Sequence, residues 1–258
     1  MEATQKDYAP VQMNFFRNIL KDLGVDVTPQ TCLLDFGCGE GWVVYNFRKQ
    51  GVKAYGVDIS AYCEEATQRC QEEHLASADE NVFRMMDMND YRIPFDDNTF
   101  DVVISDQVFE HVQYYPEALA EIKRVLKPGG CGLHVIPSRY NPIEGHVFIP
   151  LATIVRNRPY LAFWALLGVR NEYQQGLGWR EVAKLNYEYL RSSTTYYSKP
   201  KIRRLILNEF GNVSFVEELF LKYNTDRIHK YLYPLCKVIP FIPALFSTFH
   251  SRLAFFKK

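Results

Sequence analysis

The sequence lacks the features that mark several large classes of protein. Its six cysteines include no CxxC pair and no histidine partner at zinc-finger spacing. No apolar run can span a bilayer, because the best candidate, VIPFIPALFSTF, is short and interrupted by prolines. The first ten residues, MEATQKDYAP, lack the basic start and apolar core of a signal peptide. We therefore expect free thiols and a cytoplasmic protein.

The sequence also lacks an excess of charge of either sign. Its 258 residues include 30 basic and 30 acidic ones, and 47% are hydrophobic. This composition excludes a disordered chain, a collagen-like fibre and a wholly basic nucleic-acid binder. The length suits one large domain with insertions or two small ones.

The overall balance of charge conceals an asymmetry between the two halves. Residues 1–129 carry 22 acids and 12 bases, whereas residues 130–258 carry 8 acids and 18 bases. After Asp226 there is no acid at all, but there are six bases and seven aromatic residues. A basic half is typical of a chain that meets an anionic substrate, membrane or nucleic acid, although oppositely charged faces of one fold can also satisfy each other.

Short apolar runs alternate with amphipathic stretches through the first half. The pattern predicts strands at residues 31–36, 53–60, 82–87, 101–106 and 131–138. It predicts helices at residues 8–23, 40–49, 60–74 and 115–126, the last one stopped by the turn at 128–130. The second half predicts a helix from residue 200, a strand at 213–220 and a last strand at 252–258. Such alternation indicates βαβ units and a parallel sheet covered on both faces.

The most informative segment is the loop from Asp35 to Gly41, which leaves one predicted strand and enters a helix. Gly37 and Gly39 permit a tight turn, and the helix N-terminus behind them offers unpaired N–H donors. Asp58, 21 residues after Gly37, ends the second strand, where a carboxylate can accept both hydroxyls of a ribose. A dinucleotide fingerprint places its third glycine five residues after the first, whereas here the separation is four.

Four segments, which occur in this order along the chain, decide whether the loop is a dinucleotide fingerprint: LLDFGCGEG, GVDIS, IPFDDNTFDVVISDQVFEHV, and LKPGG before an apolar strand. With them, residues 30–140 resemble the class I S-adenosylmethionine (SAM) dependent methyltransferases. The resemblance is to the small-molecule group that includes the ubiquinone- and menaquinone-biosynthesis enzymes, with weaker agreement at 200–222 and 250–258. It implies the Rossmann-like α/β fold of that family, a doubly wound and mostly parallel seven-stranded sheet whose last strand is antiparallel.

The resemblance also implies how the chain is organised. We expect a single methyltransferase domain over residues 1–258. Its core is expected in three pieces, at about 26–140, 197–222 and 250–258. A largely helical lid is expected from two insertions, at about 141–196 and 224–248.

A SAM site is implied residue by residue. The methionyl part of SAM would be surrounded by Asp35, Gly37, Cys38 and Gly39. Asp58 would hold the ribose hydroxyls, with Ile59 against the adenine. Asp87 would accept from the adenine amino group, with Met88 beside the ring.

Three further residues complete the expected cofactor site. Asp106 and Gln107, just past the fourth strand, would lie under the sulfonium, and Tyr8 would close over the cofactor. More ordinary roles remain open, since Asp35 could merely cap its loop and Met88 could be core packing.

Methyl transfer to oxygen usually needs a general base. Glu110 and His111 follow the fourth strand, and should open at the carboxyl edge of the sheet where ligands bind. We predict that they act as base or contact the substrate, although His111 could simply order its loop. Arg139 and His146, at the start of the expected lid, are candidate substrate contacts, or ordinary lid structure. The sequence offers no clear second metal ligand here, so no metal is expected.

The leading hypothesis is O-methylation of a sugar or a lipid-linked glycan intermediate. Both insertions are basic and aromatic, a composition that suits an anionic acceptor or peripheral contact with an anionic membrane. A quinone or natural-product acceptor is the alternative, and a catalytically silent SAM-fold scaffold is the alternative of another class. No nucleic-acid partner is expected, because no nucleic-acid module is appended. The oligomeric state is not indicated.

Overall fold

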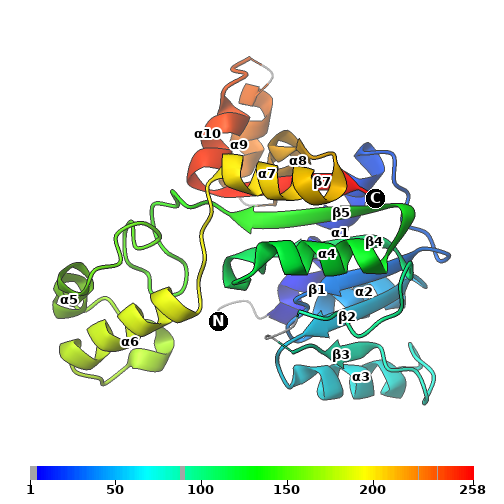
Figure 1. The fold of residues 1–258 in the computed structure, drawn as a ribbon, viewed down its shortest axis with the longest axis horizontal. Coiled ribbons are helices and arrows are strands. Elements are labelled where there is room, and N and C mark those ends of the chain that lie inside the picture. The colour runs from blue at the N-terminus through cyan, green and yellow to red at the C-terminus, as the bar shows by residue number, and fades with distance from the viewer. Residues whose placement is uncertain (1–4, 88–90, 226, 237) are drawn as a thin grey trace.

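Figure 1 shows the computed structural model of the chain, which describes residues 5–87, 91–225, 227–236 and 238–258. Its described part forms a seven-stranded sheet in the order β3-β2-β1-β4-β5-β7-β6. The strands are β1 (Cys32–Phe36), β2 (Lys53–Asp58), β3 (Phe83–Met85), β4 (Phe100–Asp106), β5 (Leu126–Pro137), β6 (Ser214–Phe215) and β7 (Ser251–Lys257). The first five pair in parallel, and β7 runs antiparallel to β5 and β6. The predicted fold class, including the reversed last strand, is confirmed.

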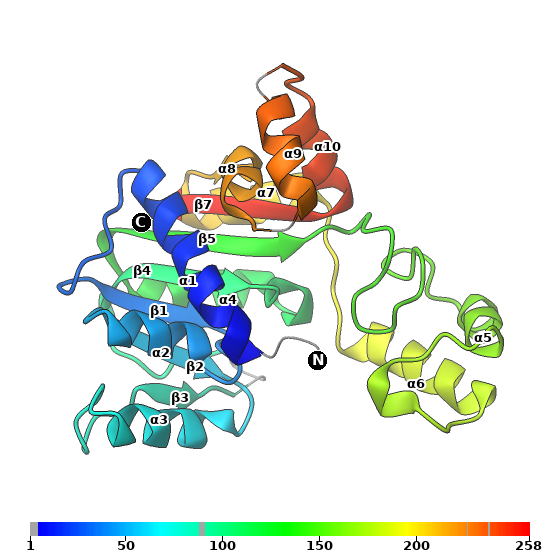
Figure 2. The same cartoon turned by 180° about the vertical axis from the view of Figure 1, so that it is seen from behind.

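Helices cover both faces of this sheet. The α-helices of the described residues are α1 (Gln5–Asp22), α2 (Trp42–Lys49), α3 (Tyr62–Glu72), α4 (Tyr115–Val125), α5 (Arg158–Leu166), α6 (Trp179–Ser192), α7 (Lys199–Phe210), α8 (Glu217–Tyr223), α9 (Arg227–Cys236) and α10 (Ile242–Phe249). Helices α4 and α7 pack on one face (Figure 1), and α1, α2, α3 and α8 on the other (Figure 2). Among the described residues, no helix is long and apolar enough to cross a membrane.

The central strands are apolar on both sides because each face meets a helical layer. In β4, Val102 and Ile104 join the cluster under α1 and α2, whereas Val103 between them joins the cluster under α4 and α7. All three side chains are at most 1% exposed. This two-sided burial explains the uninterrupted apolar run at this position in the sequence.

Two segments lie outside this three-layered core. Residues 141–196, with α5 and α6, stand beyond the carboxyl end of β5 (Figures 1 and 2). They pack around a small apolar core of their own, formed by Val147, Ile149, Ala152, Leu161 and Leu190. The second segment carries α9 and α10, which lie above β7 and contact α8.

A buried arginine fastens both ends of the 141–196 segment to the sheet. Arg252 of β7 is 1% exposed, and its guanidinium donates to the carbonyls of Pro137 and Tyr197 at 3.3 and 2.9 Å. It also donates to the hydroxyl of Ser138 at 3.1 Å. The chain therefore leaves and rejoins the core at one anchored point.

Two predicted elements are wrong in detail. The strand expected at 213–220 is only Ser214–Phe215, and helix α8 follows, because Val216, Leu219 and Phe220 recur at helical spacing and pack as one face. The turn expected at 128–130 is absorbed into β5, which already begins at Leu126. The register between β4 and β5 shifts there, and Gly129 has a φ of 81°, so the extra residues form an irregularity within the strand.

Candidate functional site

The glycine loop is held in a conformation that other residues adopt only with strain. Gly37, Gly39 and Gly41 have φ values of 79°, 52° and 75°. A Cβ on Gly37 would lie 2.4 Å from a methyl carbon of Val108, so the loop also fits closely against the second residue after β4. Helix α2 begins directly after Gly41, which directs its N-terminus towards this loop.

Asp58, at the end of β2, is fixed against the loop. Its carboxylate accepts hydrogen bonds from the N–H groups of Gly39 at 2.7 Å and Ser60 at 2.9 Å. The bond from Gly39 ties the loop after β1 to the end of β2, and the local bond from Ser60 helps to hold the carboxylate at the carboxyl edge of the sheet.

Two cavities meet over this edge. One, of about 270 Å³, lies between α1 and the glycine loop and is lined by Gln5, Tyr8, Ala9, Gln12, Asp35, Gly37, Cys38, Gly39, Trp42, Val43, Asp106 and Gln107. The other, of about 350 Å³, is lined by Gln5, Phe36, Gly37, Val57, Asp58, Ile59, Met86, Tyr91, Asp106, Gln107, Val108, His111 and Val112. They share four residues, so we treat them as one groove, named here the cofactor groove.

Buried carboxylates give the cofactor groove its electrostatic character. Burial, with repulsion from Asp106 and Asp58, raises the pKa of Asp35 to about 8. Burial also raises the pKa of Asp106 to about 6, although the amide of Gln12 donates to its carboxylate at 2.7 Å. A positively charged ligand favours the ionised forms of closely spaced acids, because it offsets the repulsion between them.

The structure brings most of the predicted cofactor residues to the groove. Beyond the loop and Asp58, these are Tyr8 and Ile59, with side chains 55% and 49% exposed, and Gln107, whose φ of 55° is left-handed. Asp87 is exposed just after β3, and Met88 lies outside the described residues. Arg139 is exposed just after β5. The ligand roles of all these residues stay predictions.

Sequence reasoning missed several residues that line the groove: Gln5, Gln12, Trp42, Met86, Tyr91 and Val108. Gln12 had a usable signal, because it lies one helical turn after Tyr8 and shares its face of α1. Met86 had a weaker signal, since it adjoins the residues expected near the adenine. Tyr91 had no signal in the sequence. It lies in an irregular loop with a φ of 52°, and no periodic pattern predicts where such a side chain lies.

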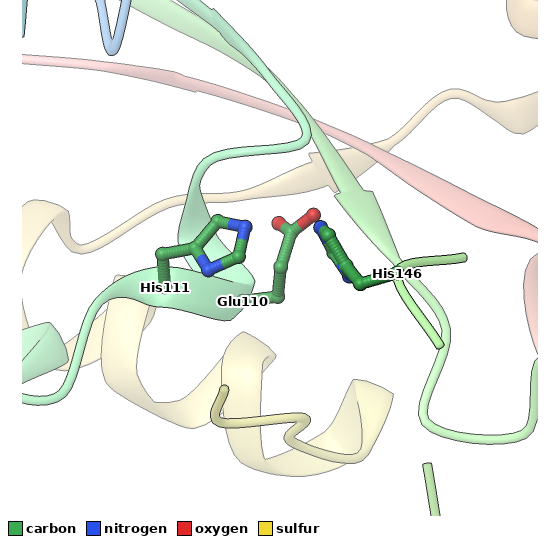
Figure 3. Close-up of side chains that lie close together, drawn as sticks. All are labelled: Glu110, His111 and His146. Carbon is green, nitrogen blue, oxygen red and sulfur yellow. The ribbon is translucent and has the colours of Figure 1, made fainter. Parts of the chain in front are cut away.

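A second feature joins the groove to the 141–196 segment. Glu110 and His111 lie in a short 3₁₀ helix, Phe109–His111, just after β4, and His146 approaches them from the segment (Figure 3). The two imidazole rings have centroids 4.9 Å apart at 78°. One ligand atom from each of the three residues lies within 4.8 Å of the others. The structure thus supplies the partner that the sequence did not reveal.

Hydrogen bonds fix both histidines. Nδ1 of His111 lies 2.8 Å from the carbonyl of Ser193 and therefore donates to it. Nδ1 of His146 lies 2.8 Å from the buried carboxylate of Glu144, which also accepts from the hydroxyl of Tyr196 at 2.7 Å. In the neutral form of each ring, Nε2 is consequently the nitrogen that carries a lone pair.

The pKa values within this cluster follow from burial and pairing. Burial raises the pKa of Glu110 to about 8 and lowers the pKa of His111. Burial alone would raise the pKa of Glu144, but bonds from His146, Tyr196 and a backbone N–H together lower it to about 2. The Glu144 carboxylate in turn raises the pKa of His146.

Comparison with known proteins shows which family the chain belongs to. Residues 34–133 match the family described as "Methyltransferase domain". The chain is 36% identical over 204 residues to a demethylmenaquinone methyltransferase of Symbiobacterium thermophilum, covering 78% of this chain and 75% of that protein. It is 36% identical over 123 residues to an uncharacterized methyltransferase of Schizosaccharomyces pombe, covering 40% of this chain and 43% of the relative. A glycine/sarcosine/dimethylglycine N-methyltransferase of Actinopolyspora halophila is 34% identical over 114 residues, covering 44% of this chain and 20% of its own.

Solved structures agree on the fold. A SAM-dependent methyltransferase of Mesorhizobium loti superposes with a TM-score of 0.54 at 13% identity, covering 96% of this chain and all of that one. The geranyl diphosphate C-methyltransferase of Streptomyces coelicolor gives 0.50 at 15% identity, covering all of this chain and 86% of its own. The chain spans less than half the length of the two relatives from S. pombe and A. halophila.

The chain therefore belongs to the SAM-dependent methyltransferases. The predicted family and cofactor are confirmed. The residues of the groove fit the cofactor, because Gly37 and Gly39 line it without side chains and the groove carboxylates suit the positive charge of SAM.

We expect Asp58→Ala to weaken binding of S-adenosylhomocysteine by about 2–3 kcal/mol, because two charge-assisted hydrogen bonds to the ribose are lost. Calorimetric titration measures the change. Glu188→Ala, an exposed acid on α6, is the matched control and should leave the affinity unaltered. Unchanged binding in a folded Asp58→Ala protein would remove this residue from the site.

The groove carboxylates also predict a pH dependence. Asp35 and Asp106 lose their protons as the pH rises through their raised pKa values of about 8 and about 6, and a cation favours the ionised forms. SAM carries one more positive charge than S-adenosylhomocysteine. The ratio of their affinities should therefore rise about tenfold from about pH 5.5 to about pH 8.5. Calorimetry on Asp106→Asn should show a flatter rise, and a ratio independent of pH in the wild type contradicts this assignment.

Proposed function

We propose that the protein transfers a methyl group from SAM to an oxygen atom of a small-molecule or lipid-linked acceptor. The observation that carries this proposal is the position of His111, which lines the same cavity as Gly37, Asp58 and Asp106. An acceptor held at His111 is thereby next to the cofactor groove. The finer assignment is a sugar or glycan intermediate, with a quinone or natural product as the alternative.

The chain's own residues have three tasks in this reaction. When bound, SAM would supply a methyl group on a positive sulfur; the sulfur would keep the bonding electrons as the acceptor oxygen took the methyl group and released its proton. The glycine loop and Asp58 hold the cofactor, and α1 with Tyr8 shields it from water. Burial lowers the pKa of His111 and so favours its neutral form, and Nδ1 donates to the carbonyl of Ser193. Nε2 can therefore accept from the acceptor hydroxyl, with the carboxyl group of Glu110 nearby.

The 141–196 segment offers a place for the rest of the acceptor. It contains a cavity of about 470 Å³, lined by Gly145, His146, Val147, Phe148, Asn171, Glu172, Tyr173, Gln174, Leu185, Asn186 and Tyr189. Aromatic side chains with a few amides suit the apolar face and the hydroxyls of a sugar ring, and they equally accommodate a prenyl chain. Because His146 belongs to both this cavity and the cluster, we assign the segment as the lid that selects the acceptor.

For a hydroxyl acceptor, we expect His111→Gln to reduce kcat about 100-fold or more, because the group that meets the hydroxyl is lost. Affinity for S-adenosylhomocysteine should stay within about threefold of the wild type. Cofactor turnover is measured against lipid-linked sugars, sugar phosphates and prenylated quinols, with the methylated product identified by mass. His74→Gln, at an exposed position, is the control for loss of a histidine.

The acceptor panel also separates the function classes. Methylation of the sugars supports the finer assignment, and methylation of the quinols alone replaces it with the alternative. Tight cofactor binding without methylation of any acceptor contradicts the proposed enzyme, and supports a scaffold.

Peripheral contact with an anionic membrane is a second part of the proposal. Val238, Phe241 and Leu245, at the α9–α10 end of the molecule, are 78%, 65% and 53% exposed. They stand in a stretch without acids, so apolar insertion and attraction to anionic lipid act together.

Co-sedimentation with vesicles tests the membrane contact. At low salt we expect the protein to pellet with anionic vesicles and to stay in solution with neutral ones. Phe241→Ser should lower the bound fraction several-fold, whereas Tyr62→Ser, 51% exposed on α3, should not. Equal recovery in the supernatant with both vesicle types rejects the contact.

A further inference from the structure

We propose that Glu110, His111 and His146 form a binding site for one divalent transition-metal ion. Their ligand atoms lie within 4.8 Å of one another, although His146 is separated from the other two by more than thirty residues of sequence. The ligands come from two bodies, the edge of the sheet and the 141–196 segment.

The Glu110 carboxylate is buried without sufficient partners. The residue is 2% exposed, and its Oε2 atom has no hydrogen-bond partner in the described part of the chain. Figure 3 shows this carboxylate between the two imidazole rings. A buried carboxylate oxygen left in this state is costly, and a cation bound at that point removes the cost.

Both histidines are already oriented as ligands. Each donates through Nδ1, His111 to the carbonyl of Ser193 and His146 to the carboxylate of Glu144. This is the outer contact that metal-binding histidines usually make, and it leaves Nε2 as the coordinating atom. Glu144 is itself immobilised, because it is fully buried and accepts from the N–H groups of His146 and Val147 at 2.8 Å.

The donor set selects the kind of ion. Two imidazoles and one carboxylate suit Zn²⁺, Fe²⁺ or Co²⁺, whereas Mg²⁺ and Ca²⁺ prefer oxygen ligands throughout. Three protein ligands leave at least one coordination position for another molecule. His111 also lines the cofactor groove, so that position is next to the place proposed for the acceptor.

The site deepens the proposed function. An acceptor hydroxyl bound to the ion would have its pKa lowered and would release its proton to water, so His111 and Glu110 would act on the hydroxyl through the ion and not by taking its proton themselves. This catalytic role rests on the proposed function, but binding of the ion rests on the ligands alone. The ion would also fasten the 141–196 segment to the sheet edge, because His146 belongs to the segment.

Metal binding is tested without reference to catalysis. The chelator-treated full chain, free of any histidine tag, is titrated with Co²⁺ by visible absorption and with Zn²⁺ by calorimetry. We expect one equivalent to bind, and a large excess of Mg²⁺ not to compete. Glu110→Gln and His146→Gln should each weaken binding about 100-fold or more, and Glu144→Gln about 10–100-fold. His74→Gln is the matched control and should bind as the wild type does.

A second readout separates loss of a ligand from loss of the fold. Each variant is titrated with S-adenosylhomocysteine, and hydrogen exchange is followed over residues 141–150 with and without Zn²⁺. Zn²⁺ should slow this exchange in the wild type but not in His146→Gln. Equal Co²⁺ affinity in wild type and His146→Gln, or a wild type that binds S-adenosylhomocysteine but no metal, overturns the proposal. A chain that binds Zn²⁺ but methylates no acceptor keeps the metal site and loses the proposed function.

Discussion

The hydrogen bond from the N–H of Gly39 to the carboxylate of Asp58 is the contact on which the site depends. It holds a left-handed glycine turn against the end of the neighbouring strand, and so fixes the backbone that a cofactor must approach. On the other side of β1, the same edge places Asp35 near Asp106. Gathering three carboxylates here costs free energy in the absence of a cation. The fold tolerates that cost because the layers of buried apolar residues on both faces of the sheet hold the strand ends in place.

The sequence was most informative where local chemistry determines structure. The glycine loop, the acid after each strand and the two-sided apolar run of β4 each follow from short-range sterics or burial. The error at 213–220 has the same origin, since a run of apolar residues fits a buried strand and a short helix equally well. Only packing of Phe220 against Phe15 and Phe246 decides between them.

The meeting of Glu110 with His146 could not be predicted in the same way. It depends on where a long insertion folds back, and that is set by contacts at both of its ends. Arg252 fixes the points of departure and return, and the amide of Thr195 donates to the carbonyl of Glu110 at 2.5 Å. Each of these residues looks ordinary in the sequence, because its partner is remote. A cluster of this kind forms only when distant segments of the chain come together, and the local periodicity of the sequence does not predict such contacts.

The position of β7 has a consequence for how the molecule assembles. This strand lies between β5 and β6, and its antiparallel pairing with β5 runs from Cys131↔Lys257 to Pro137↔Ser251. β5 and β7 are thus separated by more than a hundred residues of sequence. The edge of β5 that pairs with β7 therefore stays unpaired until β7 is in place. Such long-range closure is slow, and a long apolar strand with unpaired N–H and C=O groups can meanwhile recruit another chain. Folding of this protein therefore depends on whether β7 pairs with β5 before β5 pairs with another chain. Dilution and chaperones favour insertion of β7, because both make pairing between chains less frequent.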